Sequence, residues 1–169
     1  MPISIITRAV LGASLLGAVL SAAVEAPAQE RLKRGEYLAK IMDCTGCHTR
    51  GALAGRPDPA FALAGADIGF QIPGLGYFYP PNLTPDEETG LGKWSEADII
   101  KAVRTGERPD GRVLVPIMPW PSYGALTDED AQALAAYLKS LKPIRHKAPP
   151  MTAASDKPPA PYLTAAMPD

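Results

Sequence analysis

Cysteine and histidine are scarce in this chain, which has two of each among its 169 residues. A structural zinc site normally needs four ligands, usually including a second pair of Cys or His. Cys44 and Cys47 have one histidine beside them, His48, whereas His146 lies far along the chain. The scarcity therefore argues against a zinc site. A simple disulfide between the two cysteines would leave His48 without a role.

Further absences narrow the class of protein. The formal net charge is −1, so there is no polybasic signal for nucleic acid. No segment after the first thirty residues is apolar enough to span a bilayer, and no strand pattern surrounds Cys44, as a thioredoxin-like redox pair would require. Aromatic residues make up 7% of a chain that is 46% hydrophobic, which suits one small domain whose core is completed by a large apolar group.

The residues that are present form one motif, Cys44-Thr45-Gly46-Cys47-His48. Positions three and four apart on a helical turn share a face, so both thiols can add to the two vinyl groups on one edge of a porphyrin. The small Thr45 and Gly46 leave room for the ring, and His48 can bind the iron. This is the attachment signature of a c-type haem. The sequence therefore predicts one haem c, held covalently by Cys44 and Cys47 with His48 as an axial ligand.

Residues 1–28 have the features of a secretory signal peptide. Arg8 supplies positive charge, residues 9–20 are apolar or small, and Ala26-Pro27-Ala28 fits a small-x-small cleavage pattern, with 21–23 as a second candidate. The apolar run is shorter than the roughly 20 residues that span a bilayer. We therefore expect export to the periplasm, with an uncleaved membrane anchor as the alternative. Thioether bonds to haem would consume two cysteines that otherwise tend to pair in an oxidising compartment.

The haem-binding domain is expected to cover residues 29–142. Apolar spacing and capping residues predict three helices, at about 29–43, 95–105 and 128–140. In the first of them, Gly35 and Ala39 are small enough for a close helix crossing.

Two segments of this chain have no helical periodicity. The long Gly- and Pro-rich stretch between His48 and Trp94 either wraps the haem edge or is a surface excursion. Residues 143–169 are rich in proline, which favours a mostly disordered tail over a segment that packs on the domain or on a partner.

Met118 is the leading candidate for the second axial ligand. Pro116 and Pro119 fix their own φ angles and make its loop stiff enough to hold a thioether near the iron. A thioether raises the potential relative to two imidazoles and occupies the site that oxygen or peroxide would need. The alternative is a plain core methionine. Met42 is too close to the motif to reach the opposite face. The remaining candidates lie in the proline-rich segment, where ordering costs more entropy: Met151, Met167 and His146.

The haem propionates also need partners. N–H donors in segments expected near the ring are Trp94, Arg104 and Trp120. The alternative for each is an ordinary packing or surface role.

With these residues in place, the chain resembles the class I monohaem c-type cytochromes over residues 35–141. Within them it is most similar to the cytochrome subunits of periplasmic dehydrogenases, such as those of bacterial alcohol and gluconate dehydrogenases. The resemblance rests on the haem motif together with Gly35-Glu36-Tyr37-Leu38, Asn82-Leu83-Thr84-Pro85-Asp86, Met118-Pro119-Trp120 and the segments 89–95, 104–106, 126–130 and 136–138.

The resemblance implies an all-α fold, with helices packed around one covalent haem and long Gly- and Pro-rich loops. It implies Cys44 and Cys47 as thioether anchors and His48 and Met118 as axial ligands. It further implies an electron carrier, not an enzyme, that takes electrons from a periplasmic dehydrogenase and passes them to a membrane oxidase or another cytochrome.

One departure from the family matters. Many dehydrogenase cytochrome subunits carry three haem motifs and this chain has one, which favours a separate small carrier or a monohaem subunit. The alternatives are a non-diffusing subunit of a dehydrogenase complex and a haem enzyme or gas sensor with an open iron site.

Overall fold

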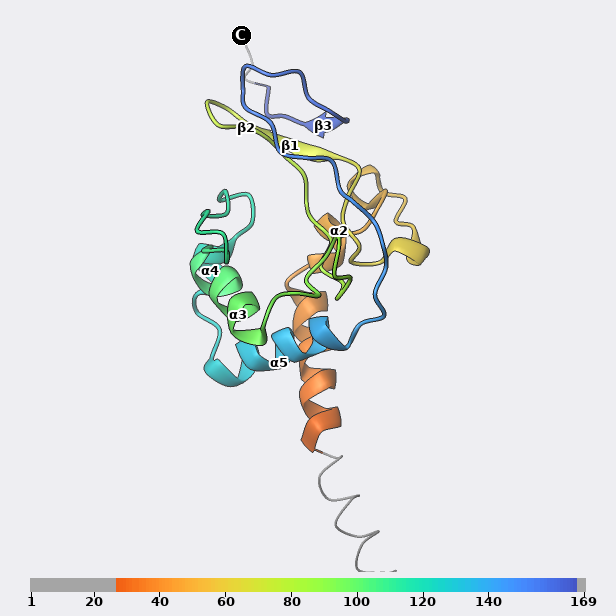
Figure 1. Ribbon diagram of the computed structural model, residues 1–169, viewed down its shortest axis with the longest axis vertical. Helices are drawn as coiled ribbons and strands as arrows, with labels where there is room; N and C mark the ends of the chain where they lie inside the picture. Colours follow the sequence, from red (N-terminus) through yellow and green to blue (C-terminus); the bar gives the residue numbers. More distant parts are fainter. Residues whose placement is uncertain (1–26, 167–169) are drawn as a thin grey trace, which may run out of the picture.

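The computed structural model describes residues 27–166, so nearly all of the expected signal peptide, 1–28, lies outside the described residues (Figure 1). One helix covers residues 27–41, and it is followed by α2 (Cys44–His48), α3 (Glu96–Thr105), α4 (Trp120–Tyr123) and α5 (Asp128–Ser140). Two short 3-10 turns, η1 (Ala52–Ala54) and η2 (Pro59–Phe61), follow α2. No helix within residues 27–166 combines the length and the apolar character needed to cross a membrane.

The helix boundaries follow the local sequence signals closely. Ser95 and Asp98 form the predicted capping box of α3, and Gly106 ends that helix with a φ of 76°. Thr127 caps α5 by accepting a hydrogen bond from the Asp130 amide. The first helix ends at residue 41, earlier than expected, because Asp43 adopts a left-handed φ of 54° and lets α2 begin on a new axis.

The first helix crosses α5 at Gly35. A Cβ added to Gly35 would overlap the Ala133 carbonyl oxygen and would lie 2.6 Å from the Cβ of Tyr137. This contact explains the small residue that the sequence places there. The buried side chains around the crossing form the core together with α3: Leu38, Ala39, Ile99, Leu134, Ala135 and Leu138.

We predict that Gly35→Ala destabilises the protein by about 1–3 kcal/mol. Alanine gains about 1 kcal/mol in helix propensity over glycine, but the clash is with backbone that cannot rotate away, so the two helices must separate. Denaturant unfolding of the mature protein measures the change. Lys33→Ala, on the exposed surface of the same helix, is the control and should stay within about 0.5 kcal/mol of the parent. A Gly35→Ala protein as stable as the parent would contradict the close crossing.

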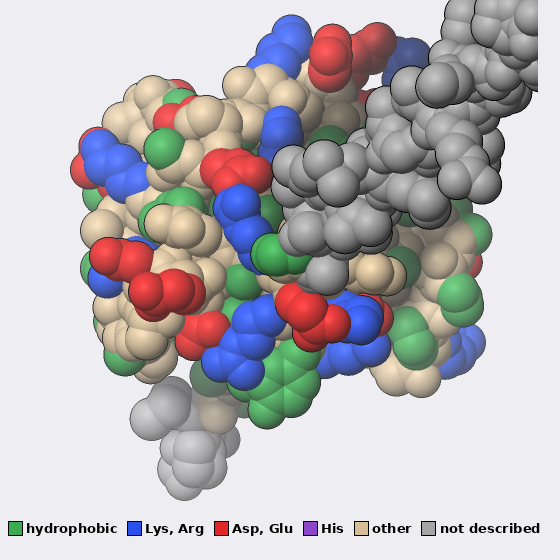
Figure 2. Space-filling model, turned by 90° about the horizontal axis from the view of Figure 1, so that it is seen from below, with side chains coloured by type: hydrophobic (Ala, Val, Ile, Leu, Met, Phe, Trp, Pro, Cys, Tyr) green, Lys and Arg blue, Asp and Glu red, His purple; other side chains and the backbone are tan. Residues whose placement is uncertain are grey.

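Exposed ion pairs link the first helix to α3 and α5. Arg31 pairs with Glu96 of α3 at 2.6 Å, and Arg34 pairs with Asp130 of α5 at 2.7 Å. Arg34 also lowers the pKa of the Asp130 carboxyl. Figure 2 shows acidic and basic side chains interspersed on the face seen from below. Exposed pairs of this kind contribute little individually, about 0–1 kcal/mol, so packing holds the helices together.

A small sheet accompanies the helices, and it was not expected from the sequence. Its strands are β1 (Gly69–Ile72), β2 (Gly76–Phe78) and β3 (Tyr162–Leu163), in the order β2-β1-β3. β1 pairs with β2 in antiparallel fashion and with β3 in parallel fashion. The strands are too short and rich in glycine to show a period-2 pattern, and β3 joins from the far end of the chain.

The expectation of a mostly disordered tail is wrong for residues 143–166. These residues run back along the domain, and β3 completes the sheet at the opposite end from α5 (Figure 1). The Tyr79 hydroxyl donates to the carbonyl oxygen of Ala160 at 2.7 Å. Residues far away in the sequence pair with the backbone groups of this segment, so its order has no local signal in the sequence.

Candidate functional site

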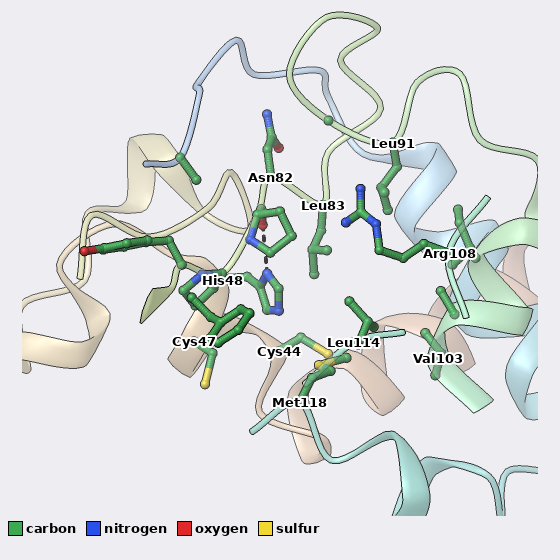
Figure 3. Close-up of a pocket in the computed structure, with 18 of the residues that line it drawn as sticks. Cys44, Cys47, His48, Asn82, Leu83, Leu91, Val103, Arg108, Leu114 and Met118 are labelled. Atoms are coloured by element: carbon green, nitrogen blue, oxygen red, sulfur yellow. Dashed lines mark hydrogen bonds between the residues drawn. The ribbon is translucent and has the colours of Figure 1, made fainter. Parts of the chain in front are cut away.

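A large cavity of about 880 Å³ lies between α2, α3, the loop that joins α3 to α4, the chain after β2 and the C-terminal segment (Figure 3). Protein interiors rarely leave voids larger than a water molecule, and cofactor sites enclose about 300–1,000 Å³. Much of the lining is apolar, including Leu83, Leu91, Ile99, Leu134 and Leu138. The volume and the lining fit a large, mostly apolar group.

His48 lies at one wall of this cavity, at the end of α2, and is 6% exposed. Its Nδ1 lies 2.8 Å from the carbonyl oxygen of Pro81, to which it donates a hydrogen bond (Figure 3). Burial lowers the pKa of His48, so the neutral imidazole is favoured. With Nδ1 protonated, the lone pair of Nε2 is free to bind a metal ion.

Cys44 and Cys47 line the same cavity, and both thiols are free. Burial raises the pKa of Cys44 to about 11 and also raises the pKa of Cys47, so both keep their protons at neutral pH. Gly46 also makes a close contact that the motif did not reveal. A Cβ at Gly46 would overlap the carboxylate of Asp43, which folds over the start of α2.

Met118 reaches the cavity from the loop between α3 and α4. The loop is tightly turned there. The Met118 amide donates to the Val115 carbonyl oxygen at 3.1 Å, and the Trp120 amide donates to the Met118 carbonyl oxygen at 2.7 Å. The stiffness expected from the flanking prolines is thus accompanied by local hydrogen bonds. The cavity therefore brings together two thiols, one oriented imidazole and one thioether.

The three expected propionate donors lie in different places. Trp94 lines the cavity. Arg104 lies outside it and pairs with Asp128 at 2.6 Å, across the start of α5. Trp120 also lies outside it, because its ring packs on Gly106 and its Nε1–H donates to the Leu114 carbonyl oxygen at 2.9 Å. The indole N–H of Trp120 and one nitrogen of the Arg104 guanidinium are thus engaged elsewhere.

Two arginines that the sequence reasoning missed line the cavity instead, Arg108 and Arg112. They flank a tight turn, in which the Arg108 amide donates to the Arg112 carbonyl oxygen at 2.9 Å. Arg108 lies 5.3 Å from the centre of the Trp94 ring, and both arginines contact Asp110. Figure 3 shows Arg108 pointing toward the side of the cavity where His48 and Asn82 lie. The Pro-Asp-Gly turn between the arginines was the available signal.

Comparisons with known proteins identify the family of this chain. A family model described as Cytochrome c matches residues 32–142. The chain is 40% identical over 121 residues to the cytochrome c subunit of a quinone alcohol dehydrogenase from Gluconobacter oxydans, covering 70% of this chain and 23% of that protein. It is 44% identical over 106 residues to the gluconate 2-dehydrogenase cytochrome c subunit of Pantoea cypripedii, covering 63% of this chain and 22% of that protein.

A third relative, the fructose dehydrogenase cytochrome subunit of Gluconobacter japonicus, is 38% identical over 119 residues, which are 70% of this chain and 23% of that protein. The chain thus spans less than a quarter of the length of each of these relatives. The family match extends over more than half of the chain and confirms the resemblance to dehydrogenase cytochrome subunits. The chain belongs to the cytochrome c family of electron-transfer proteins.

Proposed function

We propose that this protein is a periplasmic one-electron carrier that holds one haem c in the cavity. Cys44 and Cys47 are the covalent anchors, and His48 and Met118 are the axial ligands. When bound, the haem supplies reversible one-electron transfer. The observation that carries this proposal is the convergence of two thiols, an oriented imidazole and a thioether on one apolar cavity of about 880 Å³. Intact-mass measurement of the exported protein tests it, with the mass of one added haem as the expected result.

Residues around the cavity would set the ligand strength and the reduction potential of the proposed haem. The hydrogen bond from His48 to Pro81 fixes the orientation of the imidazole and makes Nε2 a better ligand. The apolar lining excludes water, which disfavours the more positively charged oxidised state and raises the potential. A thioether from Met118 acts in the same direction.

Arg108 and Arg112 replace Arg104 and Trp120 as the proposed partners of the propionates. Haem carries two carboxylates, and a guanidinium binds a carboxylate through paired N–H donors. One turn delivers both arginines to the cavity wall. Trp94 remains a candidate because it lines the cavity beside Arg108.

We expect Arg108→Gln and Arg112→Gln to lower the midpoint potential, on the order of tens of millivolts each, because the removed positive charge no longer disfavours the oxidised haem. Redox titration measures the change. Arg104→Gln is the matched control, since Arg104 lies outside the cavity and pairs with Asp128. An equal shift in all three variants would show that the effect is only one of overall charge.

The electron donor is proposed to be a periplasmic dehydrogenase and the acceptor a membrane oxidase or another cytochrome. The relatives support the donor, because all three are named as cytochrome subunits of dehydrogenases. The same names favour a second candidate function, a non-diffusing subunit of such a complex. Purification of the exported protein separates the two functions. A carrier is recovered alone and is reduced by added dehydrogenase, whereas a subunit co-purifies with its enzyme.

A further inference from the structure

The C-terminal strap, residues 143–166, lies beyond the family match and runs beside the cavity. Four of its residues line the cavity: Lys147, Ala148, Pro149 and Met151. Figure 1 shows the strap leaving α5 and passing α2 on its way to the sheet. The strap therefore forms part of the wall around the group that the cavity would hold.

Side chains of the loop after β2 hold the first part of the strap. Asn82 is 1% exposed, and its Nδ2 donates to the Ile144 carbonyl oxygen at 2.7 Å. The Ile144 amide donates to the hydroxyl of Thr84 at 3.1 Å, and the His146 amide donates to the hydroxyl of Thr89 at 3.1 Å. These side chains form the hydrogen bonds that the strap's backbone amides and carbonyl would form with a neighbouring strand in a sheet.

The same loop orients the expected iron ligand. Asn82 directly follows Pro81, whose carbonyl oxygen accepts the hydrogen bond from His48. The Oδ1 of Asn82 accepts from the Thr84 amide at 2.9 Å, so the amide side chain is bonded on both sides. The buried amide group of Asn82 thus connects the strap to the hydrogen bond of His48.

Further along, the strap is held at Thr152 by Tyr77 of β2. The Thr152 amide donates to the Tyr77 carbonyl oxygen at 3.1 Å, and the Tyr77 amide donates back to Thr152 at 2.9 Å. A Cβ at Gly76 would overlap the Thr152 carbonyl oxygen, so the two backbones approach closely. Between these two attachments, the Sδ of Met151 lies 2.7 Å from Nη1 of Arg112, which belongs to the loop between α3 and α4. The strap thereby reaches across to a second wall of the cavity.

We propose that the C-terminal strap has two roles in the haem site. It closes the cavity to small molecules. Through Asn82, it also holds the loop that orients His48. This inference rests on the proposed function, because it concerns access to the same cavity. It assigns a role to a segment outside the family match.

Two changes to the mature, haem-loaded protein test the strap. Thr152→Pro removes the amide that bonds to Tyr77, and a chain ended after Lys142 removes the whole strap. Ala154→Pro is the matched control, because Ala154 is exposed and occupies the second position of a turn closed by the Asp156 amide and the Ala153 carbonyl oxygen, where proline is favoured. The readouts are haem content, imidazole affinity of the oxidised protein and midpoint potential.

We expect Thr152→Pro and the shortened chain to bind imidazole about tenfold more tightly than the parent and to have lower potentials, while Ala154→Pro matches the parent. If Thr152→Pro has the same imidazole affinity and the same midpoint potential as the parent, the proposal is wrong. This holds even when the shortened chain fails to fold, because Thr152→Pro is an independent test. So would a shortened chain that keeps its haem with unchanged properties. A parent protein without covalent haem would refute the proposed function instead.

Discussion

Replacing both Cys44 and Cys47 by serine is expected to give an exported protein with no covalently bound haem. The two thiols line the cavity and are the groups proposed to form the thioether bonds. The loss should also reduce stability strongly, because a cofactor that binds only the folded state shifts the folding equilibrium toward that state. Intact mass and haem staining after denaturing electrophoresis measure attachment, and thermal unfolding measures stability.

The control for this double variant is Thr45→Ala, which changes an exposed position inside the same motif. Thr45→Ala should keep the full mass of the haem-bearing parent. The single variants, Cys44→Ser and Cys47→Ser, should each be limited to one thioether bond. A double variant with the same added mass as the parent would show that the haem is attached elsewhere, and the proposed site would be wrong.

Met118→Ala is expected to keep the covalent haem and to change its reduction potential, absorption spectrum and ligand binding together. Without the thioether, the potential should fall by more than about 59 mV, which is a tenfold change in the balance of a one-electron couple. The long-wavelength absorption band of sulfur-bound ferric haem should disappear, and cyanide or imidazole should bind. Redox titration and ligand titration of the same sample measure both effects.

Met42→Leu separates ligation from packing. Met42 also lines the cavity, and its backbone oxygen accepts the Tyr123 hydroxyl at 2.8 Å, a bond that leucine leaves intact. This variant should keep the parental spectrum and potential. If instead Met118→Ala left the absorption spectrum unchanged, Met118 would be an ordinary core methionine and the haem enzyme or gas sensor with an open iron site would gain support.

The helices could be predicted well because their signals are local. The capping residues Ser95 and Thr127 and the stop at Gly106 stand next to the turns that they control. The Cys-x-x-Cys-His motif is equally local, so the wall with His48 could be predicted from five residues. The carbonyl partner of His48 could not, since Pro81 is brought to it by a long loop whose path depends on the whole domain.

The arginines show the limit of local reasoning most clearly. Arg108 follows Arg104 by about one helical turn. Arg104 nevertheless pairs with Asp128, whereas Arg108 lines the cavity. The left-handed Gly106 between them redirects the chain, so the helical spacing that places Arg104 no longer applies to Arg108. The prediction for the strap failed for a related reason: its order comes from Asn82, Thr84 and Thr89, which nothing in the proline-rich sequence points to.

The parallel pairing of Gly69 with Tyr162 has a consequence for biogenesis. In the proposed export, which would begin at the N-terminus, residues 44–48 reach the periplasm before Tyr162 does. Contacts between such distant residues also form late in folding, because loop closure costs entropy first. The proposed haem attachment at Cys44 and Cys47 therefore has an interval before the C-terminal strap takes its place beside the cavity.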